Sequence, residues 1–345
     1  MNVLLTCAGR RGYLVGYFRA ALAGSGAVLA ADSSADAPAL TQADLALLVP
    51  PVAHPEYVDA LAQLCREHDV GLLISLNDLE LPVLAPHVHR FAQLSVLLAV
   101  SSPEVVAICG DKWRTAQFLH QAGIPTARTF LTIEAVQSAL TAGTVAFPLI
   151  VKPRWGTASI AVDLVQDLDE LRATVGLARA RLGRTILADA ADATAEDPDQ
   201  PLLIQEALTG QEHGLDVVND LTGTYAATFA RRKLSMRAGE TDRAVTVADP
   251  RLEDVGRRIG HALGHVGLLD CDVFVGDDVR VLELNARFGG GYPFSHVAGA
   301  DVPAALLAWT RGVSPDPDWL RITPGVRAAK ADGLVVVGQG VPTPQ

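Results

Sequence analysis

The segment VLELNARFGGGY (residues 281–292) alternates apolar and polar residues and then runs into three glycines. Glu283, Asn285 and Arg287 are two residues apart, so their side chains point to the same face of a strand. An ordinary solvated sheet face would tolerate these charges, but it gives no reason for the amide or for the glycine-rich exit. The pattern therefore predicts a strand that carries a site.

A second apolar stretch, with two carboxylates, precedes this strand. Asp270 and Asp272 share one face of the segment DCDVFV, and residues 276–278 (GDD) predict a hairpin turn between the two strands. Facing side chains of paired strands lie close enough for carboxylates and an amide oxygen to hold one hard cation. Mg²⁺ prefers such ligands together with substrate phosphates. Arg287, beyond Asn285 on the same face, would then meet a terminal or transferred phosphoryl group.

The first hundred residues alternate strand-like and helix-like segments. NVLLTCAG, AVLAADSS, GLLISLND and LSVLLAVSS are typical of buried strands, and YLVGYFRAALAGSG and YVDALAQLCREHDV of helices. This alternation favours a parallel, doubly wound sheet, so we expect a Rossmann-like domain over residues 1–100. SLNDLEL places Asn77, Asp78 and Glu80 after a strand, where they either line a substrate cleft or cap a helix.

The pattern changes after a helical segment, SSPEVVAICGDKWRTAQFLHQAG. Short strands and two helices over about 126–207 predict a small subdomain, and antiparallel strands follow beyond Gly210. We expect one domain over 101–320, with the small subdomain as a lid, and a tail or edge element over 321–345. The expected fold class is α/β, with an α+β C-terminal part.

Two further segments carry candidate ligands, although each alone is better explained as an ordinary turn or loop. Lys152 ends a strand before a loop of small residues, where an ammonium and backbone N–H groups can approach phosphate oxygens. Gln205 and Glu206, followed by Glu212, are typical of a hinge strand that pairs with a purine edge and places a carboxylate on ribose hydroxyls.

Composition excludes several classes of partner. The formal net charge is −11 and no long basic stripe is present, so we expect no nucleic-acid partner. No apolar run approaches the roughly 20 residues of a membrane span, and no basic leader with an apolar stretch opens the sequence. The four cysteines form no CxxC pair. We expect a cytoplasmic protein that binds no membrane.

In their order along the chain, these features resemble the ATP-grasp superfamily. The branch related to the carbamoyl-phosphate synthase large subunit and the pyrrolysine-biosynthesis ligase is the most similar. The resemblance is strongest in the opening VLLTCAGRRGYLVGYF and in NARFGGGYPFSHVAGAD, and it covers about residues 2–312. It implies a Rossmann-like N-terminal domain followed by a two-subdomain ATP-grasp fold, with ATP held between two antiparallel sheets.

The resemblance also implies ATP and Mg²⁺ or Mn²⁺ as cofactors and assigns residues to them. The implied ATP-binding residues are Lys112, Lys152, Arg154, Ser159, Gln205, Glu206, Ala207, Leu208 and Glu212. The implied metal ligands are Asp272, Glu283 and Asn285. The implied catalytic residues are Arg287, Arg243 and Lys152, and the substrate candidates are Arg231, Lys233, Gly290, Gly291 and His296.

The implied reaction is ATP-dependent ligation of a carboxylate to an amine. The carboxylate attacks the γ-phosphate to give an acyl phosphate and ADP, and the amine then displaces phosphate to form an amide. The expected partners are therefore a small carboxylic or amino acid and an amine, with a homodimer as an expected assembly.

Three alternatives stand beside this hypothesis. The first is phosphorylation of bicarbonate or carbamate, as in carbamoyl-phosphate synthesis. The second is a non-catalytic nucleotide-binding sensor. The third is a nicotinamide-dependent oxidoreductase, but Gly9 and Gly12 in AGRRG do not form GxGxxG, and this function leaves the polar face from Glu283 to Arg287 unexplained.

Overall fold

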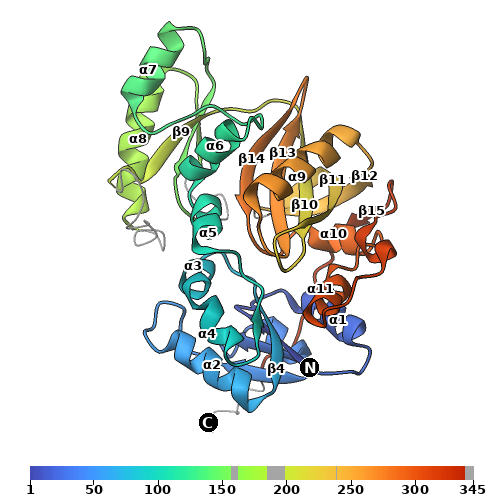
Figure 1. The fold of residues 1–345 in the computed structure, drawn as a ribbon. Helices are drawn as coiled ribbons and strands as arrows, with labels where there is room; N and C mark the ends of the chain where they lie inside the picture. Colours follow the sequence, from blue (N-terminus) through green and yellow to red (C-terminus); the bar gives the residue numbers. More distant parts are fainter. Residues whose placement is uncertain (157–161, 185–198, 238, 339–345) are drawn as a thin grey trace, which may run out of the picture.

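The computed structural model describes residues 1–156, 162–184, 199–237 and 239–338 of the chain. This part forms three sheets, which have five, four and six strands. In Figure 1 the N-terminal sheet lies at the bottom, the four-stranded sheet at the upper left and the six-stranded sheet at the upper right. Helices α5 (Pro103–Gly110) and α6 (Lys112–Gln121) run up between them.

The N-terminal sheet is parallel and has the strand order β3-β2-β1-β4-β5. Its strands are β1 (Asn2–Thr6), β2 (Val28–Asp32), β3 (Leu45–Leu48), β4 (Val70–Ser75) and β5 (Leu97–Leu98). Central β1 is apolar on both faces because Leu4 belongs to the core on the side of α2 (Tyr57–Glu67), whereas Leu5 belongs to the core on the side of α1 (Gly12–Leu22). The predicted doubly wound sheet is confirmed.

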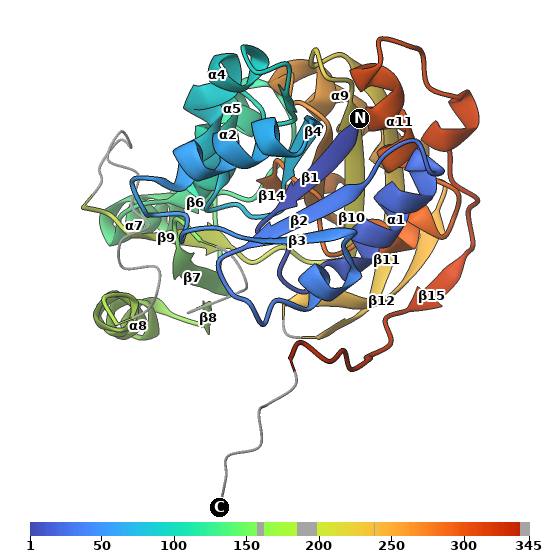
Figure 2. The same ribbon diagram turned by 90° about the horizontal axis from the view of Figure 1, so that it is seen from below.

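A helix from the far end of the chain completes this N-terminal layer. Helix α11 (Val302–Thr310) packs against α1, and Figure 2 shows the two side by side. Leu306 and Leu307 share the core of Leu5. The shorter elements around the sheet are η1 (Pro38–Gln42), α3 (Leu81–Leu84), η2 (Ala85–His87) and α4 (Val88–Ala92).

The four-stranded sheet, here called the lid sheet, is antiparallel. Its order is β6 (Thr129–Phe130), β9 (Leu202–Glu206), β7 (Leu149–Pro153) and β8 (Asp163–Val165). Helices α7 (Ile133–Thr141) and α8 (Leu168–Leu182) contribute Val136 and Leu171 to a separate hydrophobic core beneath it. The boundaries expected for the lid and for the other domains stay predictions.

The six-stranded sheet, here called the C-terminal sheet, is also antiparallel. Its order is β14 (Val279–Asn285), β13 (Leu268–Val275), β10 (Gln211–Asn219), β11 (Tyr225–Arg237), β12 (Glu240–Val247) and β15 (Arg327–Ala329). Helix α9 (Pro250–Leu263) packs on β10 and β11, and α10 (Tyr292–His296) and η3 (Pro317–Leu320) follow the hairpin. The chain beyond residue 321 thus supplies an edge strand.

The hairpin of β13 and β14 has the register that the polar pattern requires. Asp272 pairs with Glu283, and Asp270 pairs with Asn285. Arg287 lies two residues beyond the end of β14, where the chain has left the sheet. No helix in the described part of the chain has both the length and the apolar character that a bilayer crossing requires.

Candidate active site

Two cavities adjoin at the inner face of the C-terminal sheet. The first, of about 390 Å³, lies between this sheet and the lid sheet. The second, of about 370 Å³, lies between this sheet and the loops that follow β1 and β4. Gly156, Met236, Gly239, Asp272 and Glu283 line both cavities, so the two form one continuous site.

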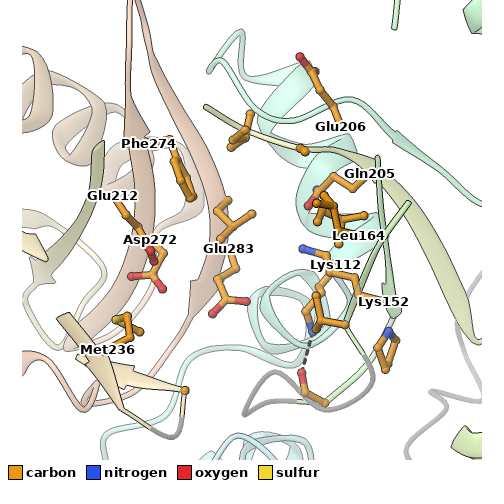
Figure 3. A pocket seen from close by; sticks show the side chains of 18 of the residues that line it. Lys112, Lys152, Leu164, Gln205, Glu206, Glu212, Met236, Asp272, Phe274 and Glu283 are labelled. Carbon is orange, nitrogen blue, oxygen red and sulfur yellow. Dashed lines mark hydrogen bonds between the residues drawn. The ribbon is translucent and has the colours of Figure 1, made fainter. Parts of the chain in front are cut away.

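The first cavity has charged side chains on two opposite walls (Figure 3). Lys112, from the start of α6, and Lys152, from β7, lie on the lid side. Glu212, Asp272 and Glu283 lie on the wall formed by β10, β13 and β14. The apolar lining includes Ile150, Leu164, Phe274 and Leu282. This arrangement suits a molecule with an apolar ring at one end and a charged group at the other.

Lys152 is buried and Lys112 is half-buried, and neither has a carboxylate partner among the described residues. Lys152 is 6% exposed, and burial together with the nearby Lys112 ammonium lowers the pKa of Lys152 to about 8. Burial also lowers the pKa of Lys112, whose Nζ donates a hydrogen bond to the Gly156 carbonyl oxygen at 2.6 Å. Neither ammonium makes an ion pair with a described residue. Two such cations favour a polyphosphate ligand.

The opposite wall gathers carboxylates. Nζ of Lys233 lies 2.7 Å from Oδ1 of Asp272 and 2.7 Å from Oε1 of Glu212. Burial raises the pKa of Asp272, against the effect of Lys233, and the nearby carboxylates of Asp270 and Glu283 raise it further. Like charges held this closely favour the binding of additional positive charge.

The oxygen atoms on this wall fit a hard divalent cation. Asp272, Glu283 and Asn285 offer two carboxylates and an amide oxygen, which Mg²⁺ accepts when phosphate and water complete its shell. Within the described residues, no three His, Cys, Asp or Glu side chains already converge as a metal-binding group. A cation at this wall would therefore depend on the Asn285 oxygen and on a bound phosphate.

A chain of ion pairs crosses the second cavity. Asp270 accepts hydrogen bonds from Arg231 at 2.9 Å and from Arg287 at 3.2 Å. Arg231 also donates to Asp216 at 2.6 Å, and Arg287 donates to Asp78 at 2.9 Å. Because Asp78 follows β4 and Asp270 belongs to β13, the chain of ion pairs joins the N-terminal sheet to the C-terminal sheet.

The glycine run after β14 leaves room for two of these charged side chains. A Cβ atom at Gly291 would lie 2.1 Å from Nη2 of Arg231, and one at Gly289 would lie 2.2 Å from Cγ of Asp270. Neither glycine has a positive φ. Close packing of charged groups, and not an unusual backbone conformation, therefore requires glycine here.

The end of β9 forms the remaining end of the first cavity. Gln205, Glu206, Ala207 and Leu208 line it. Arg280 donates to both oxygens of Glu206 at 2.6 and 2.7 Å and holds the pKa of that carboxyl below its usual value. Since Arg280 already binds this carboxylate, contacts to a bound heterocycle would come from the backbone that follows.

Arg154, expected beside the phosphates, lines neither cavity. It is fully buried, and its guanidinium donates two hydrogen bonds of 2.8 Å to Asp111. Asp111 is the N-cap of α6, the helix that begins with Lys112. Arg154 thus supports the position of Lys112 from behind.

Arg243 and His296 also lie outside both cavities. Arg243 is exposed on β12, where its Nε donates to Ser235 at 2.9 Å. The His296 ring stacks on Tyr17 with centroids 3.6 Å apart. Ser159 lies outside the described residues. In contrast, the second cavity brings together the predicted residues Arg231, Lys233, Asn285, Arg287, Gly290 and Gly291.

The second cavity also contains Arg10 and Arg11, which follow β1 and were not among the expected site residues. Asn77 and Asp78, which follow β4, line it as well, in line with the first of the two roles expected for them. These strands are neighbours at the point where the strand order reverses, which is where ligands bind in open parallel sheets. The sequence signal was present in AGRRG and SLND, because each segment directly follows a predicted strand.

Three family matches together cover most of the chain. Residues 3–99 match the PylC-like N-terminal domain, and residues 109–199 match the RimK-like ATP-grasp domain. Residues 198–333 match the family described as ATP-grasp in the biosynthetic pathway with Ter operon.

Carbamoyl phosphate synthase large chains are similar to this chain at the sequence level. Identity is 27% over 255 residues with the protein of Mycobacterium sp. (strain JLS), and 23% over 218 residues with that of Rubrobacter xylanophilus. The matches cover 71% and 60% of this chain but 21% and 19% of the relatives. The chain thus spans about a fifth of the length of these proteins.

Solved structures share the fold. The biotin carboxylase of Campylobacter jejuni aligns with a TM-score of 0.73 and 16% identity, over 93% of this chain and 73% of that one. The biotin carboxylase domain dimer of Hydrogenobacter thermophilus 2-oxoglutarate carboxylase, in complex with MgADP, gives 0.71 and 15%, over 93% and 72%. The L-amino acid ligase of Bacillus licheniformis gives 0.67 and 20%, over 91% and 75%.

Replacing Gly291 tests the packing around Arg231. We expect Gly291→Ala to lower the free energy of unfolding by about 1–3 kcal/mol, the usual cost of overpacking, because Arg231 is held by two carboxylates and cannot yield. Gly290→Ala is the matched control, since its Cβ would meet only the Glu240 carboxylate, at 3.0 Å. Urea denaturation measures both variants, and equal losses would contradict the packing explanation.

The lowered pKa of Lys152 predicts pH-dependent nucleotide affinity. Below pH 8 Lys152 is charged in the free protein; above pH 8 it must take up a proton when a polyphosphate binds. We expect the Kd for ATP to rise between pH 8 and 9.5, by up to about tenfold per unit from this residue. Lys152→Arg should flatten the profile because its guanidinium stays charged. Calorimetric titration at several pH values measures this, and identical slopes would contradict the assignment.

Proposed function

We propose that this chain, an ATP-grasp protein with a PylC-like N-terminal domain, is an ATP-dependent carboxylate–amine ligase. The observation that carries the proposal is the pair of lysines, Lys152 and Lys112, that make no ion pair with a described residue and face Asp272 and Glu283 across the first cavity. Arg287 lies in the adjoining second cavity, where a second reactant has room beside the end of a bound nucleotide.

ATP would occupy the first cavity. Its purine fits among the apolar side chains beside the backbone of Ala207 and Leu208, and its phosphates would reach Lys112 and Lys152. Asp272, Glu283 and Asn285 would hold Mg²⁺, which supplies charge neutralisation between the phosphates when it is bound. The site described here requires no other cofactor for this chemistry.

The first step is phosphoryl transfer to the carboxylate substrate. An oxygen of this carboxylate attacks the γ-phosphorus, the bond to the β-phosphate oxygen breaks, and ADP leaves with that electron pair. The lysines and Arg287 act by positioning and by stabilising the negative charge of the transferred group. The ion pairs of Arg287 with Asp78 and Asp270 hold its guanidinium in place before substrate arrives.

The second step forms the amide. The amine nitrogen attacks the acyl carbon, inorganic phosphate leaves with the electron pair of the broken C–O bond, and the nitrogen loses a proton to solvent or to a cavity carboxylate. No protein nucleophile is required. Cys7 does line the second cavity, but burial and the nearby Glu80 raise the pKa of its thiol, so it stays protonated.

Phosphorylation of bicarbonate or carbamate is the second candidate. The sequence similarity to carbamoyl phosphate synthase large chains and the fold shared with biotin carboxylases support it. Both reactions would use the same lysines and carboxylates. ADP release distinguishes them: the ligase requires a carboxylic acid and an amine, whereas the alternative responds to bicarbonate alone. ATP binding with no ADP release under any condition would support a nucleotide sensor.

Replacing Glu283 tests the proposed role of the carboxylate wall of the first cavity. We expect Glu283→Gln to lower the rate of ADP formation by about a hundredfold or more, the scale for loss of one charge-stabilising group. Asp277→Asn, in the exposed turn of the same hairpin, removes the same charge and should retain full activity. A coupled ADP assay measures both, with circular dichroism to verify folding. Equal activity of the two variants would contradict the proposed role of Glu283.

A further inference from the structure

The loop after β1 carries two arginines that the proposed reaction has not used. Arg10 and Arg11 belong to the segment AGRRG and line the second cavity beside Asp78, which follows β4. Arg10 is exposed and Arg11 is half-buried, so both guanidinium groups remain accessible to a ligand in the cavity. They follow a strand of the N-terminal sheet, whereas the phosphate-side residues belong to α6, the lid sheet and the C-terminal sheet.

Arg10 and Arg11 differ from the other cations that line this cavity, because those cations are already paired with carboxylates. Arg231 and Arg287 bind carboxylates, as described above, and Lys233 bridges two more. Arg10 and Arg11 make no ion pair with any described residue. An anion that enters the cavity would therefore find two arginines at this loop that no carboxylate of the described residues holds in an ion pair.

The start of helix α1 adds backbone donors at the same loop. Arg11 is the N-cap of α1, and no side chain caps this eleven-residue helix. The N–H of Leu14 donates to the Arg11 carbonyl oxygen at 2.9 Å, whereas the N–H groups of Gly12 and Tyr13 have no acceptor among the described residues. These donors, together with the two guanidinium groups, are suited to a carboxylate oxygen.

A group of opposite charge lies nearby. Glu240 lines the cavity, binds Lys330 at 2.6 Å, and has its pKa lowered by that lysine and by Arg10 and Arg11 despite burial. Asp78, which is paired with Arg287, is a second carboxylate in this cavity. A ligand that carries both an anionic and a cationic group would meet the unpaired arginines with the first and share one of these carboxylates with the second.

We propose that the AGRRG loop forms a subsite for the carboxylate of an amino-acid acceptor, whose amino group then points toward the acyl phosphate near Arg287. The subsite rests on the proposed ligase function, because it assigns the amine substrate of that reaction to a chemical class. It places the two reactants on opposite sides of Arg287, with the nucleotide on the lid side and the amino acid on the side of the N-terminal sheet.

The variant Arg10→Ala/Arg11→Ala tests the subsite. The probes are the twenty L-amino acids, the amines obtained by removing their α-carboxylate, and a set of aminoalkyl phosphates. ADP formation is measured with each probe and a panel of carboxylic acids. Binding is measured separately, by thermal shift in the presence of Mg²⁺ and a non-hydrolysable ATP analogue. Arg66→Ala, an exposed arginine on α2, is the control for loss of charge from the same domain.

We expect an amino acid to support ADP formation and its decarboxylated counterpart to fail. The double alanine variant should raise the KM for that amino acid at least about tenfold, with the KM for ATP unchanged. Arg66→Ala should match the parent protein. Arg10→Lys/Arg11→Lys, which keeps the charge, should recover part of the affinity, and circular dichroism verifies that each variant is folded.

The remaining outcomes separate the subsite from the reaction. Binding of an amino acid that depends on Arg10 and Arg11, without ADP formation, would support the subsite and contradict the ligase. ADP formation that the double variant leaves unchanged would support the ligase and overturn the subsite. An equal rise in the KM for ATP, binding of aminoalkyl phosphates alone, or no binding of any probe would each overturn the amino-acid assignment.

Discussion

The antiparallel register of β13 and β14 determines where chemistry can take place in this protein. It sets Asp272 opposite Glu283 and Asp270 opposite Asn285, so four oxygen-bearing side chains meet on one small area. A slip of one residue would turn the side chains of the slipped strand to the opposite face and separate them from their partners. The adjacent strand β10 allows this density, because Gly214 opposite Asp272 leaves room for the guanidinium of Arg231.

Carboxylates packed this closely require cations nearby. The arginines that supply this charge also link the N-terminal sheet to the C-terminal sheet. Arg287 reaches Asp78 after β4, and Arg231 reaches Asp216 on β10, with Asp270 shared between the two arginines. Removing one partner from such a buried chain leaves another charge uncompensated, which is usually costly. The position of the N-terminal sheet is thus coupled to the wall that faces the nucleotide-sized cavity.

Local patterns were sufficient to predict much of this architecture. Strand–helix alternation indicated the doubly wound sheet, and the spacing of the polar residues indicated the shared face of β13 and β14. Arg154 and His296 were less accessible to prediction, because Asp111 and Tyr17, which hold them, are remote in sequence and become neighbours only in the fold. Arg10 was recognisable in principle, but only once β1 and β4 were known to be adjacent.

Lys233 has a consequence for how the site is loaded. Its ammonium already sits between Glu212 and Asp272, as a counter-ion tethered to the protein. A divalent ion at this wall must therefore exchange with Lys233 or share Asp272 with it. An ion that arrives alone competes with a cation that cannot diffuse away, whereas one delivered on a polyphosphate brings oxygen ligands of its own. The wall therefore favours a metal ion that is already bound to a polyphosphate over a free metal ion of the same size and charge.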